Sequence, residues 1–121
     1  MPQTILVVDD QRSTVDLVSS VLEGVGYRVL KAYGGTQALD VIGRESPDLV
    51  LSDIMMPDID GYEVLRQARC GGYRGPFVFM SAGKNEDDVR KVGSAYLKKP
   101  FGVEDLQKTI ANVLIGEAGV L

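Results

Sequence analysis

Short apolar segments alternate with segments of helical periodicity along the whole chain. The first, Thr4–Val8, is a continuous apolar run that ends at Asp9 and Asp10, which is typical of a strand buried on both faces of a sheet. The next segment begins near Arg12 and repeats apolar residues at helical spacing as far as Val25. Because this strand-then-helix pair recurs, the pattern predicts five strands and five helices.

The predicted elements imply an α/β fold with a doubly wound, five-stranded parallel sheet and helices on both faces. The common strand order for such a sheet is 2-1-3-4-5. The expected strands are Thr4–Val8, Arg28–Ala32, Asp48–Ser52, Pro76–Met80 and Ala95–Lys98. The expected helices are Arg12–Val25, a segment around Ala38–Ile42, Tyr62–Cys70, a weakly apolar stretch near Glu86–Val92, and Val103–Ile115.

The length of 121 residues predicts a single domain, because domain sizes peak near ~100–150 residues. We expect its core to span about residues 4–115, with residues 116–121 as a frayed tail or the start of a linker. No apolar run approaches the roughly 18 residues that a membrane span needs, and the first residues do not resemble a signal peptide. The sequence therefore predicts a cytoplasmic protein without a membrane partner.

Composition excludes several kinds of chemistry. The chain has no His and one Cys, Cys70, so it has no Ser/His/Asp or Cys/His catalytic set, no internal disulfide and no Cys-based zinc site. Any metal must be a hard cation held by oxygen atoms. A pI near 4.7 argues against direct nucleic-acid binding.

Carboxylates follow two strands that lie next to each other in the predicted order. Asp9 and Asp10 end the first strand and Asp53 ends the third, at the topological switch point where ligands bind to such sheets. Three neighbouring carboxylates repel one another and call for a cation, for which Mg²⁺ is the natural choice. The alternative is that one of the first pair only caps the helix near Arg12, a role that Ser13 could equally fill.

A hydroxyl and an ammonium group follow the last two strands. Ser81 and Lys99 are placed at the same edge of the sheet as the carboxylates, where they could bind phosphoryl oxygens. Together with Asp9, Asp10 and Asp53, they are typical of an aspartate that is phosphorylated with the help of Mg²⁺.

Four motifs resemble the receiver domain of bacterial two-component response regulators, whose fold is flavodoxin-like or CheY-like. They are Val7-Val8-Asp9-Asp10, Asp53-Ile54-Met55-Met56-Pro57-Asp58-Ile59-Asp60-Gly61, Met80-Ser81-Ala82 and Lys99-Pro100-Phe101. The resemblance runs from about Thr4 to Leu114, and the motifs occur in the family's order.

The resemblance implies a role for each matching residue. Asp53 is the phosphoacceptor, and Mg²⁺, or Mn²⁺ in its place, is bound by Asp10, Asp53 and the backbone carbonyl of Met55, with Asp9 acting mainly through water. Ser81 and Lys99 match the family's hydroxyl and lysine. The remaining two matches are Tyr96, as the aromatic switch residue, and Lys99–Pro100, as a cis peptide.

The resemblance also implies partners and a signalling role. The phosphoryl donor is a histidine kinase or a phosphotransfer protein, and the output goes to a downstream protein or to an output domain outside this chain, with a phosphorylation-dependent dimer as a further option. The chain is then a switch and not a turnover enzyme. From Ser81 to Lys99 is 18 positions, shorter than in most receiver domains by roughly one helical turn, so we expect a shortened fourth helix.

Three alternatives compete with a phosphorylated switch. A pseudo-receiver would dock partners without phosphorylation, which the shortened fourth helix allows, but the complete acidic pocket argues against it. A hydrolase of the haloacid dehalogenase type needs a second Asp two residues after the nucleophile, where this chain has Met55. A flavin carrier needs a hydroxyl- and glycine-rich loop after the first strand, where this chain has Asp9 and Asp10.

Overall fold

Five parallel strands form one sheet in the predicted order β2-β1-β3-β4-β5. The structure is a computed structural model that describes residues 2–82 and 95–118. The strands are β1 (Thr4–Val8), β2 (Arg28–Ala32), β3 (Leu49–Asp53), β4 (Phe77–Ser81) and β5 (Ala95–Lys98). The described helices are α1 (Arg12–Val25), α2 (Gly35–Glu45), α3 (Gly61–Cys70) and α5 (Val103–Ala118). The predicted doubly wound α/β fold is confirmed, whereas the helix expected near Glu86–Val92 lies outside the described residues.

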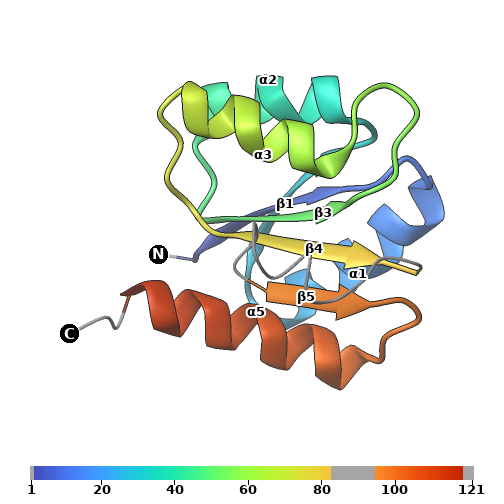
Figure 1. Ribbon diagram of the computed structural model, residues 1–121. Coiled ribbons are helices and arrows are strands. Elements are labelled where there is room, and N and C mark those ends of the chain that lie inside the picture. Colours follow the sequence, from blue (N-terminus) through green and yellow to red (C-terminus); the bar gives the residue numbers. More distant parts are fainter. Residues whose placement is uncertain (1, 83–94, 119–121) are drawn as a thin grey trace.

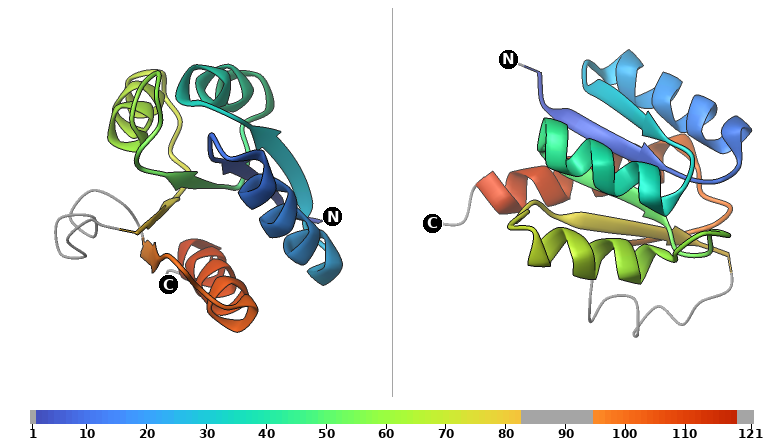
Figure 2. Two further views of the ribbon diagram at one scale, coloured as in Figure 1. Left: turned by 90° about the vertical axis from the view of Figure 1, so that its right-hand side faces the viewer. Right: turned by 90° about the horizontal axis from the view of Figure 1, so that it is seen from above.

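The sheet is a central layer between two pairs of helices. Helices α2 and α3 cover one face, and α1 and α5 cover the other (Figures 1 and 2). Successive side chains of a strand point to opposite faces. Leu6 and Val8 therefore pack against α2 and α3, whereas Ile5 and Val7 pack against α1 and α5. The continuous apolar runs of the sequence thus supply two separate hydrophobic cores.

Strands β3 and β4 begin and end one residue later than the sequence predicts. Asp48 lies before β3 because its carboxylate accepts a hydrogen bond from the Thr4 amide, at 2.6 Å, instead of pointing into a core. Pro76 has no N–H to donate and lies before β4. As a result Asp53 and Ser81 are the last residues of their strands and pair with Met80 and Lys98 across the sheet.

Helix boundaries also differ from the predicted ones. The N-cap of α1 is Gln11, without a side-chain capping bond, so the alternative in which an Asp of the first pair or Ser13 occupies the N-cap is wrong. Helix α3 includes Gly61 and is capped by Asp60, whose side chain accepts a hydrogen bond from the Glu63 amide. Helix α5 continues past Ile115 and through Gly116 to Ala118, although glycine commonly follows the end of a helix.

Within residues 2–82 and 95–118, no helix combines the length and the apolar character that crossing a bilayer requires.

Gly61 allows α3 to begin in close contact with the end of β3. A Cβ at this position would lie 2.5 Å from the Asp53 carbonyl oxygen and 3.0 Å from the ring of Phe79. We therefore expect Gly61→Ala to lower the free energy of unfolding by about 1–3 kcal/mol, as overpacking does. The matched control is Gly24→Ala in α1, where a Cβ meets nothing within 4 Å, and which should raise stability by ~0.5–1 kcal/mol. Urea denaturation measures both, and equal effects of the two substitutions would contradict the close approach.

Candidate functional site

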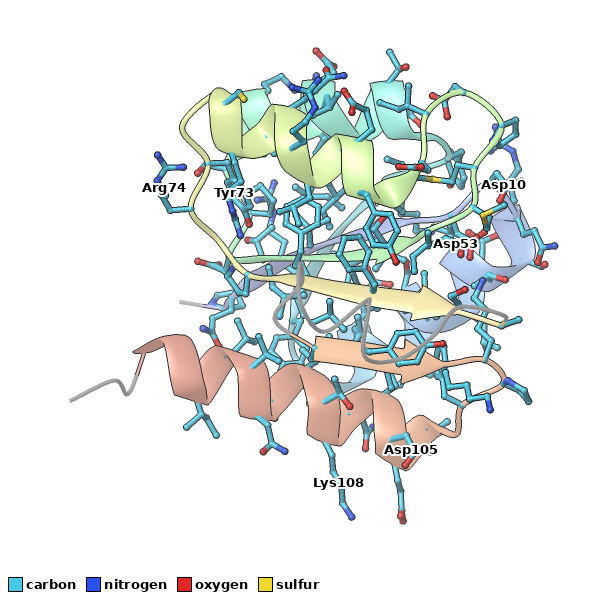
Figure 3. The ribbon with its side chains drawn as sticks, viewed as in Figure 1. Asp10, Asp53, Tyr73, Arg74, Asp105 and Lys108 are labelled. Atoms are coloured by element: carbon cyan, nitrogen blue, oxygen red, sulfur yellow. The ribbon has the colours of Figure 1, made fainter. Side chains whose placement is uncertain are left out.

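The predicted site residues meet at the carboxyl ends of the central strands. One carboxylate oxygen from each of Asp9, Asp10 and Asp53 lies within 4.8 Å of the others. Figure 3 shows Asp10 and Asp53 at the edge of the sheet toward which the strand arrows point, between the chain segments that leave β1 and β3. The strand order reverses at this point, so the topology itself creates the crevice that the carboxylates occupy.

Asp9 is completely buried, and both of its carboxylate oxygens accept hydrogen bonds. Oδ1 accepts from the Gln11 amide at 3.0 Å, and Oδ2 accepts from Lys99 Nζ at 2.8 Å. The neighbouring Asp10 is exposed. Because the two oxygens of Asp9 already have protein partners, Asp10 is the better placed of the pair to offer an oxygen to a cation directly.

Asp53 is 8% exposed and lies between opposing electrostatic influences. Burial and the nearby charges of Asp9 and Asp10 raise the pKa of its carboxyl above the ordinary value, and burial contributes most. Lys99 and the Ile54 amide, which donates to Oδ1 at 2.9 Å, oppose this rise only in part. The ionised carboxylate is therefore held in a place where additional positive charge would stabilise it.

Lys99 brings the end of β5 to the acidic crevice. Its ammonium group lies 2.8 Å from Asp9 Oδ2 and 3.6 Å from Asp53 Oδ2. The Lys99 amide donates to the Ser81 carbonyl at 2.9 Å, which fixes the end of β5 against the end of β4. The Lys99–Pro100 peptide bond is cis, as the family resemblance implied.

Ser81 and Tyr96 lie on the neighbouring strands β4 and β5, two residues apart in register. Ser81 is 3% exposed, and the hydroxyl of the buried Tyr96 donates to its carbonyl oxygen at 3.0 Å. Tyr96, which the resemblance implies to be the aromatic switch residue, is thus hydrogen-bonded to the backbone of Ser81, and its ring packs in the core.

Met55 lies in the loop that connects β3 to α3, and its side chain is exposed. The loop is closed at its base by a hydrogen bond of 2.8 Å from the Gly61 amide to the Ile54 carbonyl. The use of the Met55 carbonyl as a metal ligand stays a prediction.

The donor set of the crevice fits a hard divalent cation. Its three carboxylates face one ammonium group, from Lys99, so two negative charges remain among the described residues of the site. Oxygen donors with excess negative charge are the ligands that Mg²⁺ and Mn²⁺ take. The pocket therefore has the acidic cluster that the predicted metal requires.

Sequence reasoning missed a further carboxylate, that of Asp58. Its two oxygens accept hydrogen bonds from the amides of Gly35 and Thr36 at the start of α2. The available signal was the Gly34-Gly35 pair, since a helix that begins with two glycines has no capping side chain of its own.

Comparisons with known proteins agree with this geometry. The chain matches the response regulator receiver domain family over residues 5–111, and it belongs to that family. It is 40% identical over 111 residues to the response regulator MprA of Mycobacterium sp. (strain KMS), a match that covers 88% of this chain and 48% of MprA. The chain thus spans about half the length of the curated relatives that it matches.

Solved structures share the fold closely. The chemotaxis protein CheY4 of Vibrio cholerae superimposes with a TM-score of 0.87 at 28% identity, over 93% of this chain and 99% of CheY4. A CheY-like receiver domain protein from Methanospirillum hungatei superimposes with a TM-score of 0.91 at 27% identity, over 98% of each chain. The resemblance drawn from the sequence motifs is therefore confirmed.

The raised pKa of Asp53 predicts a pH-dependent cost to stability. The folded protein holds the Asp53 proton more tightly than the unfolded chain does, so the ionised carboxylate opposes folding at neutral pH and ceases to do so below the unfolded pKa of 3.8. We expect Asp53→Asn to melt at a higher temperature than the wild type at pH 7 in EDTA, and this gain to vanish as the pH approaches 3.8. Asp48→Asn, which removes the same charge at the opposite edge of the sheet, should show no such gain. A wild type that is the more stable at pH 7 would refute the prediction.

Proposed function

We propose that this receiver domain is phosphorylated on Asp53 and uses the modification as a binding switch. The observation that carries the proposal is the position of the Asp53 carboxylate, which lies within reach of Asp9, Asp10 and Lys99 at the topological switch point. The phosphoryl donor is a phosphohistidine on a partner kinase or phosphotransfer protein, the donor that the family resemblance implies.

Phosphoryl transfer at this site needs little beyond positioning and charge compensation. A carboxylate oxygen of Asp53 forms a bond to phosphorus while the phosphorus–nitrogen bond of the donor breaks, and its electron pair stays on the imidazole. Lys99 offers its ammonium group to a phosphoryl oxygen, since it already lies 3.6 Å from Asp53 Oδ2. Mg²⁺ or Mn²⁺, held by Asp10, Asp53 and the Met55 carbonyl, would supply the remaining positive charge.

The proposed switch connects the phosphoryl group to β5 through Ser81 and Tyr96. The Ser81 hydroxyl moves toward the phosphoryl group, and Tyr96, which already faces the core in the unphosphorylated protein, fills the space that the hydroxyl leaves. Such a switch requires that the phosphoryl group contact two arrangements of the protein differently. The bond from the Tyr96 hydroxyl to the Ser81 backbone carbonyl joins β5 to the residue whose hydroxyl is proposed to move.

The proposal gives the chain a signalling role and not a turnover activity. Its output goes to a downstream protein, to an output domain outside this chain or to a second phosphorylated copy, and not to nucleic acid directly. The cytoplasmic location expected from the sequence stays a prediction. The competing pseudo-receiver role would use the same fold for docking while Asp53 stayed unmodified.

Intact mass distinguishes phosphorylation from a pseudo-receiver role. After incubation with Mg²⁺ and acetyl phosphate, we expect the wild type to gain the mass of one phosphoryl group and Asp53→Asn to gain none, because the Asp53 carboxylate lies beside the carboxylates of Asp9 and Asp10 and within 3.6 Å of the Lys99 ammonium group. Asp48→Asn is the control for the loss of one carboxylate elsewhere and should be labelled like the wild type. Labelling of Asp53→Asn, or no labelling of the wild type, would refute the proposal.

The switch can be tested separately from phosphorylation. We expect Ser81→Ala to accept phosphate from acetyl phosphate while the amide chemical shifts of Ala95–Lys98 change much less than in the wild type, since the moving hydroxyl is gone. Nuclear magnetic resonance of the labelled proteins measures both. Ser19→Ala, which alters a buried serine on α1, should respond like the wild type. Equal shift changes in wild type and Ser81→Ala would show that Ser81 does not couple the site to β5.

A further inference from the structure

The start of α2 is capped by a side chain from a different loop. The first amides of a helix have no partner within the helix, and the N-cap of α2, Gly34, has no side chain with which to bind them. Asp58, from the loop between β3 and α3, takes this role. Its Oδ1 accepts from the Gly35 amide at 3.1 Å, and its Oδ2 accepts from the Thr36 amide at 2.9 Å.

The same loop also packs against α2 through an apolar contact. A Cβ at Gly35 would collide with the side chain of Ile59 and would lie 3.0 Å from the Ile59 carbonyl oxygen. A Cβ at Gly34 would lie 3.2 Å from Asp58 Oδ2. The two glycines therefore provide the space into which Asp58 and Ile59 fit, so the loop and the helix start are complementary in both shape and hydrogen bonding.

This contact fixes the far end of the loop that carries Met55. At its near end the loop is held by the last residue of β3, Asp53, and by the bond from the Gly61 amide to the Ile54 carbonyl. The exposed side chain of Met55 packs into neither core. The position of the Met55 carbonyl thus depends on the anchors on either side of it, and Asp58 is the anchor that follows it in the chain.

The start of α2 is also connected to the other half of the acidic site. The carbonyl of Ala32, at the end of β2, accepts a hydrogen bond from the Asp9 amide at 3.2 Å. Only Tyr33 and Gly34 separate Ala32 from α2. The segment from Ala32 to Thr36 therefore contacts both chain segments that supply carboxylates to the crevice.

From these contacts we propose that Asp58 is a positioning residue for the cation site. By binding the start of α2, its carboxylate holds the Met55 carbonyl where that oxygen can share a cation with Asp10 and Asp53. The inference rests on the proposed function, because it concerns the same metal. The negative charge of Asp58 also favours its contact with the start of α2, because a helix N-terminus attracts negative charge. The amides of Thr36 and Gly35 keep the pKa of the Asp58 carboxyl well below its usual range.

The test compares two substitutions that remove the same charge. Asp58→Ala removes both charge and acceptors, whereas Asp58→Asn removes the charge but keeps a carbonyl oxygen that can accept from one of the two amides. Mn²⁺ affinity is measured from the loss of the free-ion signal in electron paramagnetic resonance, and melting temperature is recorded beside it. The stability control is Asp48→Ala, which removes a carboxylate that likewise accepts a backbone amide from another segment, far from the site.

We expect Asp58→Ala to weaken Mn²⁺ binding about tenfold, the loss typical when a group that orients a metal ligand is removed. Asp58→Asn should recover most of this loss, and Asp48→Ala should bind Mn²⁺ like the wild type even where its melting temperature falls as far. Equal weakening of Mn²⁺ binding by Asp58→Ala and Asp58→Asn would show that the loss comes from the missing charge and not from the missing hydrogen bonds. Unchanged binding in Asp58→Ala would show that Asp58 has no influence on the cation site. Either result overturns the proposal.

Failure of the proposed function gives a different result. The metal site requires that the wild type bind Mn²⁺ and that Asp10→Ala abolish this binding. If either result is not found, the metal site and the positioning role are both refuted. Should Asp58→Ala not fold, Gly34→Ala provides the comparison, because it keeps the carboxylate but places a Cβ 3.2 Å from Oδ2. Weaker Mn²⁺ binding in Gly34→Ala then supports the proposal, and unchanged binding overturns it.

Discussion

Repulsion between carboxylates at the ends of β1 and β3 is the constraint on which the rest of the structure depends. Asp9 is completely buried and Asp53 nearly so, although like charges in a poorly solvated place destabilise each other. The two apolar cores pack on either face of the paired strands β1 and β3, so burial of apolar side chains keeps the two strand ends side by side despite this repulsion. Lys99 offsets part of the repulsion, and the remainder makes the site receptive to a cation.

The two edges of the sheet have opposite characters. At the edge away from the acidic site, polar groups bind the backbone and close the chain on itself: the Tyr73 hydroxyl donates to the Pro47 carbonyl at 2.7 Å, and Arg69 donates to the carbonyls of Tyr73 and Gly75. Figure 3 shows Tyr73 at that edge, at the opposite end of the sheet from Asp53. The hydrogen bonds that close the chain and the acidic site therefore lie at opposite ends of the strands.

The sequence predicted the fold and the acidic cluster for the same physical reason. Continuous apolar runs identify buried parallel strands, and a parallel sheet brings the residues that follow those runs to one edge. Asp9, Asp53 and Lys99 were found in this way. The strand boundaries of β3 and β4 were one residue early, because the polar contacts of Asp48 and the missing amide of Pro76 do not show in an apolar pattern.

What the sequence did not predict depends on contacts between distant segments. The hydrogen bonds that the amides of Gly35 and Thr36 donate to the Asp58 carboxylate join residues 23 and 22 positions apart, and no local periodicity encodes them. The N-cap of α1 was also missed, since Gln11 occupies that position without the capping bond that makes Asp or Ser recognisable. Pattern therefore identifies elements and edges, and tertiary contacts decide how their ends are completed.

Because Asp58 caps α2 from a later part of the chain, α2 cannot be completed before that later part has been synthesised. During synthesis, Gly34 and Gly35 leave the ribosome well before Asp58. A short helix that begins with glycine does not readily nucleate by itself. The first turn of α2 is therefore completed only when the segment after β3 has emerged and folded back onto it. Helix α2 and the loop between β3 and α3 then form as one cooperative unit, and local unfolding of either one releases the other.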